Sequence, residues 1–230
     1  MDDNEKKIDF SAFLASMAHD MKNSLGMLLN TIDEVVSTCK PDKCPSHRYL
    51  SQMQYEATRV NFNLIQLLTL YKMDRGQFSI NISHYPVSEI IEDIVLQNKP
   101  LLDFKGIEIF TECPDDLTWF LDSNLVSGVI NNILNNAYRY AKSKILIRVE
   151  ENNGWLAVGI EDDGQGYPEE MLGTGLRAGS GVSFATGSTG LGLYFASMVA
   201  KLHKNKDREG NISISNGGEY GGGCFTVNLP

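Results

Sequence analysis

Apolar residues repeat at helical spacing in the first third of the chain. Steps of 3 or 4 separate nearly all of them in residues 10–36, namely Phe10, Leu14, Met17, Met21, Leu25, Leu28, Ile32 and Val35. This pattern predicts a long amphipathic helix with a coiled-coil-like seam. A second stripe of the same kind runs from Leu50 to Tyr71 and ends before Arg75-Gly76, which suits a helix end. Prolines and small polar residues separate the stripes, so we expect an antiparallel helical hairpin.

The apolar seam of this hairpin is too long for two helices to cover. Two such hairpins packed together form a four-helix bundle, which is the usual way to bury a seam of this kind. The sequence contains one hairpin, and we therefore expect a homodimer with two-fold symmetry.

After Gly76 the pattern changes. Residues 77–83 alternate as a strand would, and residues 87–102 have helical spacing with Ser88 as the expected cap. Further strands are expected at 107–111, 119–121, 144–150, 155–161, 212–215 and 224–229, and further helices from Asp122 or Ser123 to about Ala141 and from the glycine-rich stretch 173–192 to about His203. Helices and mostly antiparallel strands in this order predict an α/β sandwich, with helices on one face of one sheet.

The expected fold class is therefore α plus α/β. Residues 1–75 form a helical hairpin within a dimeric four-helix bundle, and residues 76–230 form an α/β sandwich domain. A chain of 230 residues with 42% hydrophobic and 21% charged residues is long enough for two such domains, each with its own core.

Composition excludes several classes of function. The net charge of −9 leaves no broad basic surface, so we expect no nucleic-acid partner, and any phosphate must be held locally by backbone amides, a few cations or a metal. No apolar run reaches the roughly 18 residues that a membrane span needs, and the acidic start is no signal peptide. We expect a cytoplasmic protein. Cys39 and Cys44 flank the loop of the hairpin as ordinary loop cysteines, with a metal or redox role as the alternative.

The first candidate for chemistry is His19. It lies about 200° around the helix from Met17 and from Met21, so its side chain points away from the seam. The adjacent Asp20 can orient the ring or take its proton, and Asn23 lies one turn further on. An exposed imidazole with these neighbours suits nucleophilic attack on phosphorus, and the alternative is an ordinary surface histidine.

The second candidate lies on the helix after Asp122. Asn132 and Asn136 are four residues apart and present two carboxamide oxygens on one face, where they can hold Mg2+ among phosphate oxygens. Arg139 follows on the same side and can bind phosphate. The alternative is a solvated helix face, although four asparagines within six residues are unusual for a residue that forms helices poorly.

Two glycine-containing segments complete the set. Residues 162–166, Asp-Asp-Gly-Gln-Gly, follow an expected strand. The glycines let the backbone approach a ligand closely, and Asp162 can accept a hydrogen bond from an exocyclic amine. Taken alone, this segment is also compatible with a turn. Residues 187–193 open a helix and offer free amides and a favourable dipole to a phosphate chain, although such a segment is weak evidence by itself.

In this order and spacing, the four segments resemble the catalytic portion of sensor histidine kinases of two-component systems, along nearly the whole chain. Residues 19–23 are similar to the phosphoacceptor box, residues 132–140 to the N box, residues 162–166 and 187–193 to the two glycine boxes, and residues 210–215 and 223–230 to the final two strands.

The resemblance implies a role for each of these residues. His19 would accept the γ-phosphoryl group of ATP, with Asp20 as the base that activates it. Asn23 matches the position that orients a water when the response regulator is dephosphorylated. The protein would therefore be an ATP-dependent histidine kinase that phosphorylates an aspartate of a response regulator and also acts as its phosphatase.

The resemblance also assigns the nucleotide and metal site. Asn136, supported by Asn132, would coordinate Mg2+, Arg139 would contact phosphate, Tyr140 would cover the adenine and Asp162 would bind the adenine amino group. The remaining nucleotide-binding residues belong to the two glycine boxes, namely Gly164, Gly166, Thr189, Gly190, Leu191 and Gly192.

Three features depart from the family pattern. The segment between the glycine boxes is rich in glycine and lacks the usual paired phenylalanines, so we expect a mobile lid there. Residues 204–209 replace a short glycine turn. No sensor domain precedes His19, so the signal is expected from a separate sensor protein or from a sensor domain missing from this sequence.

Other classes of protein have a similar ATP pocket. Anti-sigma serine kinases lack the helical hairpin, and chaperone and mismatch-repair ATPases would not need His19. A scaffold with a decayed nucleotide domain is disfavoured because Asn132, Asn136 and Asp162 are all present.

Overall fold

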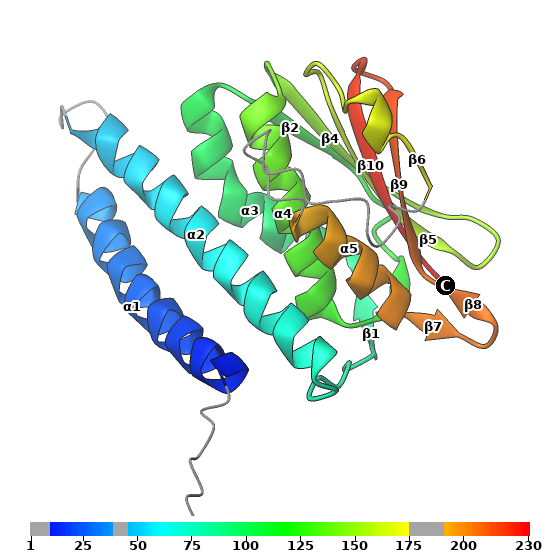
Figure 1. Cartoon of the computed structure of the whole chain (residues 1–230). Coiled ribbons are helices and arrows are strands. Elements are labelled where there is room, and N and C mark those ends of the chain that lie inside the picture. Colours follow the sequence, from blue (N-terminus) through cyan, green and yellow to red (C-terminus); the bar gives the residue numbers. More distant parts are fainter. Residues whose placement is uncertain (1–9, 39–45, 175–190) are drawn as a thin grey trace, which may run out of the picture. The chain divides into compact units, whose positions relative to one another are not determined.

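The computed structural model describes residues 10–38, 46–174 and 191–230 and divides the chain into two compact units, one within residues 1–78 and one from Ser79 to Pro230 (Figure 1). Cys39 and Cys44 of the expected loop lie outside the described residues, as does most of the expected lid. Within the described ranges, no helix combines the length and the apolar character needed to cross a membrane.

The first unit is a pair of antiparallel helices that pack against each other, α1 (Phe10–Thr38) and α2 (His47–Asp74) (Figure 1). The predicted hairpin is confirmed. Helix α2 ends with Arg75 as its C-cap, and Gly76 follows at a φ of +64°, a left-handed conformation that favours glycine.

The hairpin buries one part of its apolar surface and exposes another. Ala18, Ile32, Ala57 and Leu64 are buried. The exposed part is a stripe of large apolar side chains, each between 43% and 57% accessible, formed by Met17, Met21, Leu28 and Val35 of α1 and Met53, Val60 and Leu67 of α2. Aligned apolar side chains on an exposed face are typical of a surface that another molecule covers.

The second unit is an α/β sandwich. Its sheet has the order β2-β4-β5-β10-β9-β6; β2 and β4 are parallel, and the other neighbours are antiparallel. The strands are β2 (Glu108–Glu112), β4 (Lys144–Glu151), β5 (Leu156–Asp162), β6 (Gly173–Thr174), β9 (Asn211–Gly217) and β10 (Gly222–Leu229), and the short helix η1 (Glu169–Met171) precedes β6. The helices α3 (Val87–Lys105), α4 (Ser123–Tyr140) and α5 (Leu191–Leu202) lie on one face of this sheet (Figure 1).

Alternating side chains of the central strands build the core. In β5 and β10, Val158, Ile160, Phe225, Val227 and Leu229 are buried, and the residues between them are more exposed. This alternation is the expected pattern for a sheet with one covered face, and it confirms the predicted sandwich.

The second unit also contains two two-stranded sheets. Strand β1 (Ser83–Pro86) pairs with β3 (Thr118–Leu121), and β7 (Lys204–Asn205) pairs with β8 (Arg208–Glu209). The sequence predicted only a longer connection where β7 and β8 lie. The turn between β4 and β5 is confirmed, because Asn153 and Gly154 both have positive φ and Asn152 exchanges two backbone hydrogen bonds with Trp155.

Two local predictions were wrong. Residues 77–82 form no strand, because the ladder with β3 begins only where Ser83 pairs with Leu121 and residues 77–82 have no partner strand. Ser88 does not cap α3, since the helix already begins at Val87 and the Ser88 hydroxyl donates to the carbonyl of Asp115 instead.

Asp122 joins three parts of the second unit. Its Oδ1 accepts the N–H of Leu125 and so caps α4, as predicted, and its Oδ2 accepts the N–H of Asn81. The N–H of Asp122 donates to Nε2 of His203, just after α5. His203 is 2% exposed, and its Nδ1 lies 2.8 Å from the carbonyl of Val199, so the neutral ring donates there and accepts at Nε2.

We expect Asp122→Ala to lower the free energy of unfolding by about 2 kcal/mol, because it removes a helix cap and leaves the N–H of Asn81 without its acceptor. Both tryptophans of the chain, Trp119 and Trp155, lie in this unit, so urea unfolding followed by their fluorescence measures it directly. Asp207→Ala, in the exposed β7–β8 turn, is the control and should shift the midpoint little. An unchanged midpoint for Asp122→Ala would contradict the role of this junction.

His203 should make the unit less stable in mild acid. Burial holds the pKa of His203 below its ordinary value of 6.5, so the folded ring stays neutral where the unfolded ring is protonated. The contribution of the neutral His203 ring to the free energy of unfolding is therefore fully present well above pH 6.5 and is lost as the pH falls below that value. We expect the urea midpoint to fall between pH 7 and pH 5 and His203→Gln to flatten that fall. The control is His84→Gln, at an exposed histidine, which should leave the pH dependence of the urea midpoint unchanged. A pH dependence in His203→Gln as steep as in the unmodified chain would rule out His203 as its source.

Candidate active site

His19 lies on α1 with its side chain 62% exposed, as its position opposite the seam predicted. Its Nδ1 lies 3.4 Å from Nδ2 of Asn23 and 3.8 Å from Oδ1 of Asp20. The two polar neighbours therefore meet at the same ring nitrogen. The other nitrogen, Nε2, makes no hydrogen bond to the residues that the structure describes.

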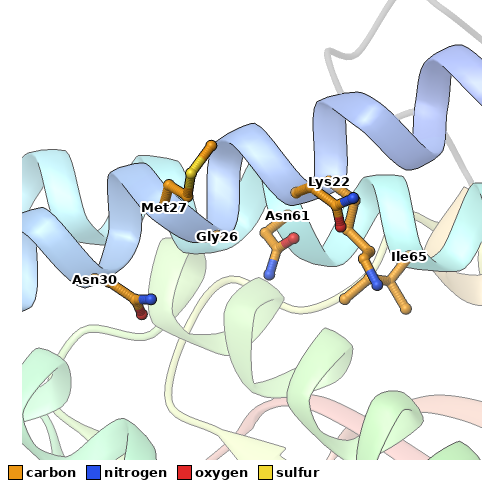
Figure 2. Close-up of a pocket in the computed structure, with 7 residues that line it drawn as sticks. Lys22, Gly26, Met27, Asn30, Asn61 and Ile65 are labelled. Carbon is orange, nitrogen blue, oxygen red and sulfur yellow. The ribbon is translucent and has the colours of Figure 1, made fainter.

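A groove of about 400 Å³ lies between α1 and α2, with Asn23, the neighbour of His19, in its lining (Figure 2). Sequence reasoning missed it, because its two walls come from different helices. Three carboxamides contribute to its lining, which consists of Lys22, Asn23, Gly26, Met27, Asn30, Asn61 and Ile65. Among the described residues, none bonds to the buried Oδ1 of Asn61, so the groove offers an unused acceptor.

The asparagines of α4 are not a solvated face. Asn131, Asn132 and Asn135 are buried, and Oδ1 of Asn131 accepts a hydrogen bond from Asn98 of α3 at 2.8 Å. Asn136 is half-buried. Since polar groups in a core need partners, Asn131 serves packing between helices, and Asn132 and Asn136 remain the candidates for a ligand.

Asn132 meets the start of α5. Gly192 lies so close to its carboxamide that any side chain at position 192 would overlap it. The Nδ2 of Asn132 is buried and finds no acceptor within the described part of the chain. The structure thus brings Asn132 together with Leu191 and Gly192 of the second glycine segment. Thr189 and Gly190 lie outside the described residues.

The far end of α4 carries Arg139 and Tyr140, which are both exposed. The guanidinium carbon of Arg139 lies 5.4 Å from the centre of the Tyr140 ring, a cation–π contact that aligns the two side chains. Gly164 packs against this helix end, because a Cβ there would lie 2.6 Å from the Tyr140 carbonyl. The first glycine segment and the end of α4 therefore adjoin.

Asp162, at the end of β5, joins two distant backbone segments. Its Oδ1 accepts the N–H of Gly164 at 2.7 Å and that of Gly223, in β10, at 3.2 Å. Its Oδ2 accepts no hydrogen bond from the residues that the structure describes. A Cβ at Gly222 would lie 2.6 Å from Oδ1, so glycine is required for this close approach. One oxygen of Asp162 is fixed, and the other remains for a ligand.

Sequence reasoning missed Gly222, Gly223 and Asn216. Asn216, on β9, accepts the N–H of Tyr167 at Oδ1 and donates to the Tyr167 carbonyl through Nδ2. The glycine-rich turn 217–223 was the available signal for Gly222 and Gly223, but the approach of β10 to Asp162 depends on a pairing between strands 61 residues apart.

The neighbouring Asp163 has a different role. Partial burial favours its neutral acid, but hydrogen bonds from the N–H and hydroxyl of Ser143, together with backbone bonds at Lys144 and Lys142, outweigh that effect. They hold the pKa of Asp163 well below its usual range. Asp163 therefore fastens the loop after α4 and is not available to a ligand.

These groups fit a nucleotide with a metal better than a metal alone. No cluster of three or more His, Cys, Asp or Glu side chains that could hold a metal ion occurs in residues 10–38, 46–174 and 191–230. Asn132 and Asn136 offer neutral amide oxygens, which suit Mg2+ when phosphate oxygens complete its coordination. The Nδ2 of Asn132, for which the described residues offer no acceptor, is a hydrogen-bond donor and could serve a phosphate oxygen but not the metal.

Residues 121–230 match the family described as histidine kinase-, DNA gyrase B-, and HSP90-like ATPase. Among curated proteins, the sensor protein SrrB of Staphylococcus aureus (strain N315) is 23% identical over 225 residues, which cover 95% of this chain and 37% of SrrB. The chain thus spans little more than a third of the length of the curated relatives it matches.

Solved structures share the architecture. The Acinetobacter baumannii histidine kinase AdeS aligns over 92% of this chain and 96% of its own, with a TM-score of 0.57 and 20% identity. Full-length ShkA, in complex with AMPPNP, aligns over 95% of this chain and 45% of its own, with a TM-score of 0.61 and 16% identity. The catalytic domain of the histidine kinase ThkA aligns over 66% of this chain and 96% of its own, with a TM-score of 0.53 and 21% identity. The chain therefore shares the fold of these histidine kinase structures, which is a helical region followed by a mixed α/β domain.

Proposed function

We propose that the chain, whose residues 121–230 match the histidine kinase-, DNA gyrase B- and HSP90-like ATPase family and which is similar to sensor kinases over most of its length, autophosphorylates on His19. It then transfers the phosphoryl group to an aspartate of a response regulator and also acts as the regulator's phosphatase. The observation that carries the proposal is the exposed His19, whose Nδ1 meets both Asp20 and Asn23.

The position of Asp20 supports Nε2 of His19 as the nucleophile. Asp20 acts as the base for the proton on Nδ1, and the lone pair of Nε2 is then free to attack the γ-phosphorus of ATP. In this tautomer Nδ1 is a donor, so the Nδ2 of Asn23 makes no hydrogen bond to it. The new N–P bond forms as the bond to the bridging oxygen breaks, and ADP leaves with the electron pair. Asp20 stabilises the positive charge that the ring gains during attack.

Asn23 supports the phosphatase activity. Its carboxamide lies at the rim of the groove between α1 and α2 and within 3.4 Å of the ring of His19. In this role it orients a water for attack on the phosphoaspartate of the response regulator. Neither Asp20 nor His19 needs to form a covalent bond to the phosphoryl group in this reaction.

Asp162 and the glycines would hold the nucleoside. The Oδ2 of Asp162 accepts the adenine amino group, and Gly164 and Gly166 let the base approach the backbone. Tyr140 covers the adenine and Arg139 binds phosphate. The amides of Thr189, Gly190, Leu191 and Gly192 at the start of α5 serve the phosphate chain.

Mg2+ would be held by Asn136 with support from Asn132. When bound, the ion neutralises charge on the phosphate oxygens. The buried Asn132 keeps its amide in a fixed orientation because Gly192 packs directly against it.

The exposed apolar stripe of the hairpin supports a homodimer. A second copy of the hairpin would cover Met17, Met21 and Leu28 of α1 and the matching residues of α2 in a four-helix bundle. The proposal further includes a cytoplasmic location, a cognate response regulator and a sensor, either as a separate protein or as part of a longer chain.

The phosphoacceptor is tested by His19→Ala. With γ-labelled ATP, the unmodified chain should acquire label that is lost in acid and kept in base, as expected for phosphohistidine. His19→Ala should lose this label completely, whereas the matched control His84→Ala, at another exposed histidine, should keep it. Acid-labile labelling that persists in His19→Ala would refute His19 as the acceptor.

The metal site is tested by Asn136→Ala. Removal of one ligand should lower the Mg2+-dependent labelling rate by about 100-fold, a typical effect for loss of one group that stabilises developing charge. Light scattering should show the same dimer, because Asn136 lies outside the hairpin. Asn228→Ala, at the opposite end of the sheet, is the control. A labelling rate for Asn136→Ala within twofold of the unmodified chain would exclude Asn136 as a ligand.

A further inference from the structure

Asn216 holds both polar groups of one loop residue. The backbone N–H of Tyr167 donates to Asn216 Oδ1 at 2.6 Å, and Asn216 Nδ2 donates to the Tyr167 carbonyl at 2.8 Å. A carboxamide has an acceptor oxygen and a donor NH2 group, so the asparagine side chain can pair with the N–H and C=O of one residue as the backbone of a neighbouring strand would. The loop after β5 is thereby fastened to β9, 49 residues away in the chain.

Two glycines make room for this arrangement. Gly166 has a φ of +80°, and a Cβ there would lie 2.6 Å from Oδ1 of Asn216. A Cβ at Gly223 would lie 2.9 Å from Cε2 of Tyr167 and 3.1 Å from Oδ2 of Asp162. The edge of the Tyr167 ring and the Oδ2 of Asp162, which accepts no hydrogen bond from the described residues, therefore lie next to each other at Gly223.

We propose that Asn216 is a positioning residue for the nucleotide base, because it fixes the backbone of Tyr167 and so holds the Tyr167 ring as a wall beside Asp162. This inference rests on the proposed function. It assigns Tyr167 to the base pocket, in addition to the residues that the family resemblance implies.

The wall should act on the base and not on the phosphates. A fixed ring beside Oδ2 excludes water from the hydrogen bond between Asp162 and the base amino group, which strengthens that bond. If Asn216 no longer holds the loop, the Tyr167 ring moves and the site loses selectivity for adenine over other bases. The side-chain hydrogen bonds of Asn216 within the described residues go to Tyr167, so the proposed phosphate-binding groups on α4 and α5 should be unaffected.

The experiment compares Asn216→Leu with Asn228→Leu in the full chain. Asn228 is the matched control, because its side chain also makes an amide hydrogen bond, to Asn211 at 3.0 Å, at the other end of the same strand pair. For Asn216→Leu we expect the KM for ATP in autophosphorylation to rise about tenfold, kcat to stay within about twofold, and the preference for ATP over GTP to narrow. Asn228→Leu should change none of these.

Tyr167 provides a second test if Asn216→Leu lowers the tryptophan-monitored stability. Tyr167→Phe keeps the ring and should retain the KM for ATP, whereas Tyr167→Leu should raise it as Asn216→Leu does. Unchanged ATP selectivity in both Asn216→Leu and Tyr167→Leu would overturn the inference and leave the proposed function intact. Absence of ATP binding by the unmodified chain, measured by calorimetry, would instead overturn the proposed function and this inference with it.

Discussion

The carboxylate of Asp162 holds the candidate nucleotide site together. Its Oδ1 binds two backbone amides, at Gly164 and Gly223, so the end of β5 and the start of β10 are fixed to one charged group in a largely buried position. Charged groups in such places need several hydrogen bonds, and these two leave the second oxygen for a ligand. The glycines around Asp162 follow from the same constraint, since a side chain at Gly164 or Gly222 would displace the carboxylate or the backbone that binds it.

The chemistry is divided between units that each fold around their own contacts. The hairpin carries the proposed phosphoacceptor His19, whose side chain is 62% exposed, on helix α1. The sandwich supplies fixed polar groups around glycine, where the backbone itself serves recognition. In the proposed function, backbone amides, Mg2+ and Arg139 bind the triphosphate, so an acidic chain with a net charge of −9 needs no broad basic surface for this purpose.

Sequence periodicity was sufficient for the helices and the central strands, because burial on one face imposes its period directly, as in the stripe from Leu50 to Tyr71 and the alternation of β5. It was insufficient for residues 77–82, whose alternation finds no partner strand, and for Ser88, whose hydroxyl bonds to Asp115 instead. The roles of Asn216 and Gly223 were also beyond it. Both depend on contacts between residues about 50 to 60 positions apart, and a single sequence does not reveal which strands become neighbours.

The junction at Asp122 has a consequence for the connection between the units. The N–H of Gln77 is bonded to the carbonyl of Lys72 at the end of α2, and the N–H of Asn81 is bonded to Asp122, so only three residues between them are free of these anchors. Such a tether reaches roughly 14 Å when fully extended. Short tethers keep the joined parts at effective concentrations in the millimolar range. Loss of the hydrogen bond between Asn81 and Asp122 would therefore lengthen the tether that joins the two units.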